Sequence, residues 1–184
     1  MTRLLDAHVT GSGGTAWEIG SFDVSGGTLR PHLERRGWRY VGVDIAVGPN
    51  VDIVLDDPYV LPASDGSVDL LVSAQAFEHI EFFWLTFKEM ARVLRPGGWI
   101  LLLAPSRGPE HRYPVDCWRF YPDGYRALAK WGGLEAVEVG TDWRKFEGRW
   151  PRRRKNLWGD TWGAFQKPEG GEPKVHKPEA AAIA

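Results

Sequence analysis

Residues 67–106 read SVDLLVSAQAFEHIEFFWLTFKEMARVLRPGGWILLLAPS, and this stretch decides the expected fold. Val68–Val72 is a short, almost unbroken apolar run of branched side chains, which is typical of a strand covered on both faces. Apolar residues then recur at helical spacing from Phe83 to Leu94, and Pro96-Gly97-Gly98 ends the helix. Trp99–Ala104 is apolar throughout. This order of strand, helix and strand predicts a βαβ unit, and therefore a parallel sheet covered by helices.

The composition favours one globular domain. The chain has 184 residues, of which 43% are apolar and 26% charged, so we expect a single buried core within residues 1–166. The formal net charge of −1 gives no global attraction for nucleic acid or a membrane surface. Cys117 is the only cysteine, which excludes an internal disulfide and favours a reducing, cytoplasmic location. The first residues lack the apolar centre of a signal peptide, and no apolar run reaches the ~20 residues of a membrane-spanning helix.

The other elements are predicted from short apolar runs between turn residues. We expect strands at Ala16–Ile19, Tyr40–Ile45, Val51–Leu55, Leu134–Val139 and Leu157–Phe165, and helices at about Thr28–Arg36 and Pro122–Ala129. Residues 1–15 are predicted to be a flexible lead-in with one short helical stretch, and residues 167–184 a disordered tail. The predicted fold class is α/β, with a doubly wound, mostly parallel Rossmann-like sheet whose last strand is antiparallel.

A glycine turn follows the first expected strand, and an acid ends the second. Gly20 allows a ligand to approach the backbone closely, and the N-terminus of the next helix favours a negative group. Asp44 stands where an acid after the second strand reaches ribose hydroxyls. The dinucleotide pattern Gly-x-Gly-x-x-Gly is broken by Phe22, and the next glycine is Gly26. The pattern therefore favours a nucleotide-containing ligand other than a nicotinamide dinucleotide; alternatively, Gly20 and Asp44 simply mark a turn and a strand end.

Four segments, in this order, resemble the class I S-adenosylmethionine-dependent methyltransferases of the broad type 11 group. They are WEIGSFDVSGG (17–27), YVGVDI (40–45), LDDPYVLPASDGSVDLLVSAQAFEHI (55–80) and EMARVLRPGGWILLLAPS (89–106). The resemblance covers residues 17–139 and implies S-adenosylmethionine as the cofactor. The cofactor-binding residues that it implies are Glu18, Gly20, Ser21, Asp44, Ile45, Asp56, Asp57, Ser73, Ala74 and Gln75.

The resemblance also implies a role for each of these positions. Glu18 and Gly20 would border the methionine part of the cofactor, while Asp44 would bind the ribose and Ile45 would pack on adenine. One of the two acids at 56–57 would approach the adenine amino group, and residues 73–75 would lie beside the reactive methyl. The glycine loop departs from the family's acid-x-Gly-x-Gly-x-Gly, because Phe22 and Val24 stand in its later glycine positions.

Two histidines follow the fourth and fifth expected strands and are the candidate catalytic bases. His79 lies in Glu78-His79-Ile80, a tripeptide common in this family whatever the substrate, so a structural role is the alternative. His111 lies in a polar loop that we expect to meet the substrate. The predicted substrate-binding residues of this loop are Arg112, Tyr113, Asp116, Trp118 and Arg119. For Asp116 and Arg119, a salt bridge that holds the loop is the alternative.

A metal site is a second interpretation of the same region. Gln75, Glu78, His79 and His111 are similar to the metal-binding residues of small-RNA 3′-terminal 2′-O-methyltransferases. Gln75 replaces a carboxylate, which leaves a poorer site for a hard cation, so the use of a metal stays open. The basic run from Arg149 to Lys155 fits phosphate contacts, although a solvated loop is the commoner explanation.

The favoured function is methyl transfer from S-adenosylmethionine to a hydroxyl or amine of a small molecule, such as a sugar-like or secondary metabolite. The alternatives are an RNA 2′-O-methyltransferase with a divalent metal and a non-catalytic cofactor-binding or scaffold domain. The pocket needs a cover, which we expect from residues 107–121, from the basic link at 141–156 or from a second subunit. We therefore predict that Trp118 and Arg119 face the pocket and that the protein forms a homodimer.

Overall fold

The computed structural model describes residues 1–24, 26–142 and 158–170. Its strands are β1 (Thr15–Ile19), β2 (Arg39–Asp44), β3 (Ile53–Val54), β4 (Val68–Ala74), β5 (Leu94–Arg107), β6 (Glu135–Thr141) and β7 (Gly159–Gln166). Its helices are α1 (Thr2–His8), α2 (Arg30–Arg35), α3 (Phe83–Val93) and α4 (Pro122–Gly132), with a short 3-10 helix η1 (Phe77–His79). No helix among these described residues is long and apolar enough to cross a membrane.

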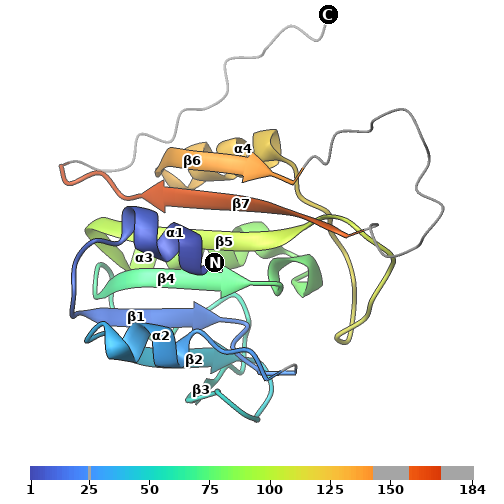
Figure 1. Cartoon of the computed structure of the whole chain (residues 1–184), viewed down its shortest axis with the longest axis horizontal. Coiled ribbons are helices and arrows are strands. Elements are labelled where there is room, and N and C mark those ends of the chain that lie inside the picture. The colour runs from blue at the N-terminus through green and yellow to red at the C-terminus, as the bar shows by residue number, and fades with distance from the viewer. Residues whose placement is uncertain (25, 143–157, 171–184) are drawn as a thin grey trace, which may run out of the picture.

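The strands form one sheet in the order β3-β2-β1-β4-β5-β7-β6 (Figure 1). The pairs from β3 to β5 are parallel, whereas β7 runs antiparallel to both β5 and β6. The chain leaves β1 towards β2 on one side and returns to β4 on the other, so the strand order reverses between β1 and β4. The predicted doubly wound, mostly parallel sheet with an antiparallel last strand is confirmed.

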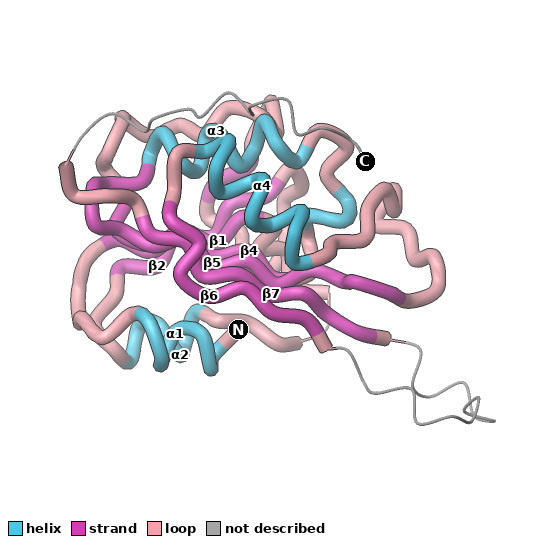
Figure 2. Tube along the Cα trace, turned by 90° about the horizontal axis from the view of Figure 1, so that it is seen from above, coloured by secondary structure: helices cyan, strands magenta, loops and turns pink. Residues whose placement is uncertain are grey.

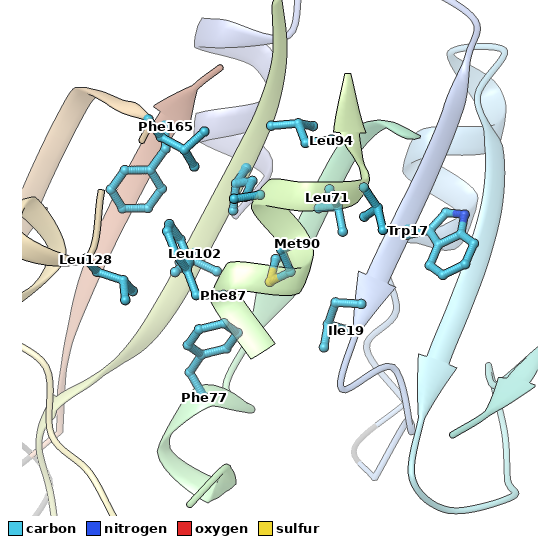
Figure 3. Close-up of a cluster of buried hydrophobic side chains, with 14 of the residues drawn as sticks. Trp17, Ile19, Leu71, Phe77, Phe87, Met90, Leu94, Leu102, Leu128 and Phe165 are labelled. Atoms are coloured by element: carbon cyan, nitrogen blue, oxygen red, sulfur yellow. The ribbon is translucent and has the colours of Figure 1, made fainter. Parts of the chain in front are cut away.

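Helices cover both faces of the sheet, with α1 and α2 on one face and α3 and α4 on the other (Figure 2). The larger core lies under α3, where Phe87 and Met90 are fully buried and lie close to Leu71 and Leu102 of the sheet (Figure 3). Burying a side chain of this size contributes about 1.5–3 kcal/mol. The periodic apolar face of α3 therefore fixes the central βαβ unit that the sequence predicts.

The chain passes from α3 into β5 without a separate turn. The helix ends at Val93, and Leu94 already pairs with Val68 at the start of β4. The helix thus ends within one residue of the expected Leu94, but Pro96-Gly97-Gly98, which was expected to stop it, lies inside β5. Gly97 has φ +74 and its N–H donates to the carbonyl of Lys167, so it shapes the start of the strand.

The predicted flexible lead-in is wrong for the first residues of the chain. Helix α1 lies against the sheet, and Leu4 and Leu5 are buried in the second core with Leu33 and Leu70. Arg3 and His8 reach Glu138 on β6 at 2.7 and 2.8 Å. These contacts to residues distant in sequence hold α1 as part of the folded domain.

Two other expectations need correction. Strand β3 has only two residues, because Asp52 turns its carboxylate towards the N–H of Gly42 and the guanidinium of Arg30. The expected disordered tail does not begin at Lys167, whose N–H donates to Gly98 and whose Nζ donates to two carbonyls. The rest of the predicted tail, residues 171–184, and the basic link at 143–157 lie outside the described residues.

Candidate functional site

The residues expected at the cofactor site come from neighbouring strands at the carboxyl edge of the sheet. Glu18 on β1 lies in register with Gly42 on β2 and with Val72 on β4. Asp44 ends β2 and Ala74 ends β4, so their side chains and the following loops border the point where the strand order reverses. Open α/β sheets bind ligands in the crevice at this position.

The turn after β1 packs closely against the segment after β4. Gly20 has φ +75, and a Cβ added to it would lie 2.2 Å from the Cβ of Ala76. The N–H groups of Gly20 and Ser21 both donate to the carbonyl of Val43 on β2. Position 20 therefore needs glycine both for its backbone conformation and for the close approach of the two loops.

The altered glycine loop is closed by an aspartate. The Oδ1 atom of Asp23 accepts from the N–H of Gly26 at 2.6 Å and from that of Gly27 at 3.2 Å. An aspartate that accepts backbone N–H groups a few residues on forms a local turn. Hydrogen bonds from Gly26 and Gly27 to Asp23 thus form a turn in place of the later glycines of the family pattern.

Asp44 is held by two backbone donors. Its Oδ2 accepts from the N–H of Phe22 at 3.0 Å, and its Oδ1 accepts from the N–H of Ala46 at 3.1 Å. The carboxylate therefore ties the turn after β1 to the end of β2. Ile45, next in the chain, is 55% exposed and is available for an apolar contact.

Glu18 is buried and engaged with the protein itself. The hydroxyl of Tyr40 donates to its carboxylate, and the amide of Asn50 donates to that hydroxyl at 2.8 Å. Burial raises the pKa of Glu18, although these hydrogen bonds oppose the shift. A direct contact of Glu18 with the methionine part of a cofactor stays a prediction.

The other expected cofactor residues differ in their surroundings. Asp56 and Asp57 are exposed, and Asp57 accepts from the N–H of Tyr59 at 2.8 Å. The Ser73 hydroxyl is buried and makes no hydrogen bond with any residue that the structure describes. Gln75 has φ +57, and its amide donates to Asp160 at 3.0 Å.

A second group of polar residues forms where η1 meets the loop after β5. The N–H groups of Cys117 and Trp118 donate to the Glu78 carbonyl at 2.7 and 3.2 Å. The Glu78 side chain is fully buried, and burial raises its pKa to about 7. The Nε2 atoms of His79 and His111 each lie 3.7 Å from Glu78 Oε1. The structure thus brings both predicted catalytic histidines together around one carboxyl group.

Asp116 and Arg119 form the ion pair that the sequence analysis named as the alternative. Arg119 donates to both carboxylate oxygens of Asp116, at 2.5 and 2.8 Å, and also to the carbonyl of Pro109. The guanidinium holds the pKa of Asp116 well below its usual range. The N–H of His111 donates to the same carboxylate at 2.8 Å. The pair therefore braces the loop and positions His111, and a substrate contact for either residue stays a prediction.

The remaining loop residues face different surroundings. Trp118 donates its Nε1–H to the carbonyls of Ile80 and Glu81 and is 37% exposed. Its ring packs on Phe83 at a centroid distance of 5.3 Å. The Tyr113 ring lies 5.9 and 6.1 Å from the rings of His79 and His111. Arg112 pairs with Glu110 at the surface. Tyr113 is thus in edge contact with the rings of both histidines.

Sequence reasoning missed three polar residues of this edge, namely Tyr40, Asn50 and Asp160. Tyr40, on the next strand, donates to Glu18, and Asn50, in the loop that follows, donates to the Tyr40 hydroxyl. Asp160 binds Gln75 across the sheet although 85 positions separate them. No local pattern predicts such a pairing, because it exists only once β7 lies beside β5.

A hollow of about 350 Å³ lies away from this edge, between the start of β4 and the end of α3. Its lining residues are Asp65, Gly66, Lys88, Ala91, Arg92 and Lys167. Arg92 is paired with Asp65 and Glu89, and the Lys167 ammonium is bonded to two carbonyls. The chemistry at the carboxyl edge is therefore a better guide to function than this hollow.

Sequence comparison identifies a related family. Residues 22–102 match the family model described as a methyltransferase domain. A protein of Mycobacterium sp. (strain KMS) named an uncharacterized methyltransferase is 36% identical over 104 residues. The match covers 48% of this chain and 41% of that relative, so the chain spans less than half of the relative's length.

Solved structures share the fold at low sequence identity. The 1,6-didemethyltoxoflavin-N1-methyltransferase of Burkholderia thailandensis, bound to S-adenosylhomocysteine, has a TM-score of 0.68 and 16% identity, covering 91% of this chain and 76% of its own. The [4+2]-cyclase SpnF has a TM-score of 0.69 and 14% identity, covering 92% of this chain and 80% of its own. The predicted resemblance to class I methyltransferases and the predicted fold are confirmed.

Proposed function

We propose that this chain, whose residues 22–102 match the model of the methyltransferase domain family, binds S-adenosylmethionine at the carboxyl edge of β1, β2 and β4 and transfers its methyl group. The observation that carries the proposal is the arrangement of Gly20 and Asp44. A carboxylate oriented by two backbone donors stands beside a turn that only glycine can make. This pairing is suited to a ribose-containing ligand at the switch point of the sheet.

The residues present fit this cofactor. The buried Ser73 hydroxyl, which has no hydrogen-bond partner among the described residues, provides a polar atom near the end of β4. Ile45 offers an exposed apolar side chain directly after Asp44, as a stacking partner for a base requires. A positive methyl sulfonium supplies its own activation, so this chain would mainly orient the two reactants and exclude water.

The proposed acceptor is a hydroxyl or amine of a small molecule, bound next to His79, His111 and Tyr113. Both histidines lie in segments that follow the carboxyl ends of strands beside the cofactor site, and they share the buried Glu78. A positioned histidine removes a proton from an acceptor and contributes about 10²–10⁴-fold to the rate. Tyr113 and Trp118 would form apolar walls, and Arg112, Asp116 and Arg119 would form the polar rim.

Two other functions use the same fold. A non-catalytic cofactor-binding or scaffold domain is the first alternative, because a fold does not fix a function. An RNA 2′-O-methyltransferase is the second alternative, and it has less support because the basic link lies outside the described residues. We also propose that a homodimer covers the carboxyl edge.

Calorimetry with S-adenosylhomocysteine tests the cofactor site. Asp44→Ala should weaken binding by at least about tenfold, because each 1.4 kcal/mol of lost contact is tenfold in affinity. Asp123→Ala is the matched control, since this carboxylate is fully exposed on α4 and pairs only locally with Arg126. Equal affinities for the wild type and Asp44→Ala would contradict the proposal, as would tight binding of NADH.

A further inference from the structure

We propose that Glu78, His79 and His111 bind a divalent transition-metal ion. One ligand atom from each residue lies within 4.8 Å of the others. Glu78 and His79 come from η1 after β4, and His111 comes from the loop after β5. These three residues would bind the ion without the cofactor and without methyl transfer.

The Glu78 carboxyl group is a buried ligand without a partner. Its residue is 0% exposed, and neither side-chain oxygen accepts a hydrogen bond from another residue in the described part of the chain. Burying an ionised carboxylate without a partner is costly, and bound cations are one of the means by which proteins offset that cost. Both oxygens are therefore free to bind an ion placed between Glu78 and the histidines.

Each histidine ring has an oxygen atom near its Nδ1, with a hydrogen bond in His79 and without one in His111. The His79 Nδ1 atom faces the carbonyl of Val115, which can only accept, so the proton is on Nδ1 and the Nε2 lone pair points towards Glu78. The His111 Nδ1 atom lies 3.3 Å from Asp116, and its Nε2 lies 3.7 Å from Glu78. A carbonyl or carboxylate behind the ring is the common support of a metal-binding histidine.

Two of the three separations between ligand atoms are close to those around a bound ion. Metal bonds of about 2.1 Å at tetrahedral angles hold neighbouring ligand atoms about 3.4 Å apart. Each Nε2 atom is 3.7 Å from Glu78 Oε1, which is close to that value. The loop that carries His111 is already bonded to η1 through the N–H of Cys117. All three ligand atoms lie within 4.8 Å of one another, so the loop that carries His111 would close further on η1 when an ion binds.

The charges and ligands around Glu78 are compatible with a bound cation. The positive charge of Arg119 is paired with Asp116 through two hydrogen bonds, so it leaves the Glu78 carboxyl group without a direct counter-charge. Gln75 is turned to Asp160 and is not part of the ligand set. Two imidazoles and one carboxylate suit zinc, iron and related first-row ions better than magnesium or calcium, which prefer oxygen ligands. Three protein ligands also leave a position open for water or another ligand.

The metal inference changes the roles assigned to the histidines. A lone pair that binds a metal ion does not accept a proton, so His79 and His111 would act as ligands in place of general bases. An acceptor hydroxyl would then bind at the open position, where a metal ion lowers its pKa. Metal binding is measured without any cofactor. A negative result for metal binding can therefore be distinguished from a negative result for methyl transfer.

The test is calorimetric titration of the chelator-treated full chain with Zn²⁺, without cofactor. We expect one ion per chain. Glu78→Gln and His111→Ala should each weaken binding by at least about 100-fold, since loss of an outer-shell partner alone costs about 10–100-fold. His32→Gln is the matched control, because His32 is half-buried beside Asp6 on the other face of the sheet and should leave affinity unchanged.

Thermal unfolding provides the second measurement. Zn²⁺ should raise the melting temperature of the wild type and of His32→Gln, and it should not raise that of His111→Ala, which changes a loop residue outside the core. This readout keeps the inference testable even if Glu78→Gln folds poorly. Absence of Zn²⁺ binding by the wild type would overturn the inference, and so would wild-type affinity in His111→Ala.

Discussion

Gly20 combines two constraints in one residue. Its φ of +75 lies in the left-handed region, and the position of an added Cβ is blocked by the Cβ of Ala76 at 2.2 Å. Gly26 has nearly the same φ of +80, but nothing lies within 4 Å of its added Cβ. A side chain at position 26 would therefore cause backbone strain only, whereas a side chain at position 20 would cause both backbone strain and a clash.

We predict that Gly26→Ala lowers the free energy of unfolding by about 1–2 kcal/mol, which is the cost of a left-handed alanine. Gly20→Ala should lower it by about 3 kcal/mol or more, because the clash with Ala76 adds to that strain. Urea unfolding measures both values. The double variant Gly20→Ala/Ala76→Gly should recover the steric part of the loss. Equal losses in both single variants would show that the approach to Ala76 does not matter.

The sequence predicts a site residue best where its position depends on neighbouring residues in the chain. Gly20 and Asp44 follow strand ends, so turn chemistry and strand order were sufficient to predict their positions. The surroundings of Glu78 depend on a loop that begins after β5, and no short pattern indicates that its carboxyl group is buried without a partner. The ion pair of Asp116 and Arg119 was predictable as an alternative because the two residues are three positions apart.

Helix α1 is joined to the far edge of the sheet through one carboxylate. Glu138 on β6 accepts from Arg3 at 2.7 Å, and it also lies 2.8 Å from His8 and 2.9 Å from the indole nitrogen of Trp162. The Arg3 guanidinium contributes most to a lowered pKa of about 2 for Glu138. Because the group is partly exposed, solvent screens the pair and limits its contribution to stability.

We predict that Glu138→Gln lowers the free energy of unfolding by about 0.5–1 kcal/mol at pH 7. The folded pKa is below the ordinary value of 4.5, so this stabilisation is present above pH 4.5 and is lost as the pH falls towards 2. The difference between wild type and variant should therefore shrink below pH 4.5 in urea unfolding. Glu135→Gln is the control on the same strand, and we expect no comparable change. A difference that does not depend on pH would contradict the ionic origin of the effect.

The elements that the sequence predicted most accurately are those that bury a full periodic face. Helix α3 was predicted to within one residue, because Phe87 and Met90 recur on the side that faces the sheet. Helix α1 was missed as part of the fold, because the glycines after it suggest a flexible segment and only Leu4 and Leu5 mark its buried side. Its stability comes from contacts with β6 and α2, which are invisible in the local sequence.

The exposed apolar residues of the molecule are distributed unevenly. Many large, exposed hydrophobic side chains lie in segments that follow the carboxyl ends of the parallel strands. They are Val24, Ile45, Val47, Val60, Phe82, Leu85, Tyr113, Trp118 and Tyr121. Apolar side chains concentrated on one side of a protein usually mark a surface that binds a ligand or a partner. The same edge carries the proposed cofactor site, so a partner bound there would also exclude water from it.

We therefore expect the protein to form a homodimer through this edge, with twice the chain mass in light scattering at micromolar concentration. Leu85→Asp should shift the protein to a monomer, because a charge buried without a partner at an interface costs several kcal/mol. Leu85 is 40% exposed in the first turn of α3, so the substitution should not disturb the core. Val137→Asp is the matched control. Val137 is 43% exposed, and it lies on β6, which is an edge strand of the sheet. A monomeric wild type at this concentration would refute the dimer. Dissociation by Val137→Asp, with Leu85→Asp still dimeric, would instead place the interface on β6.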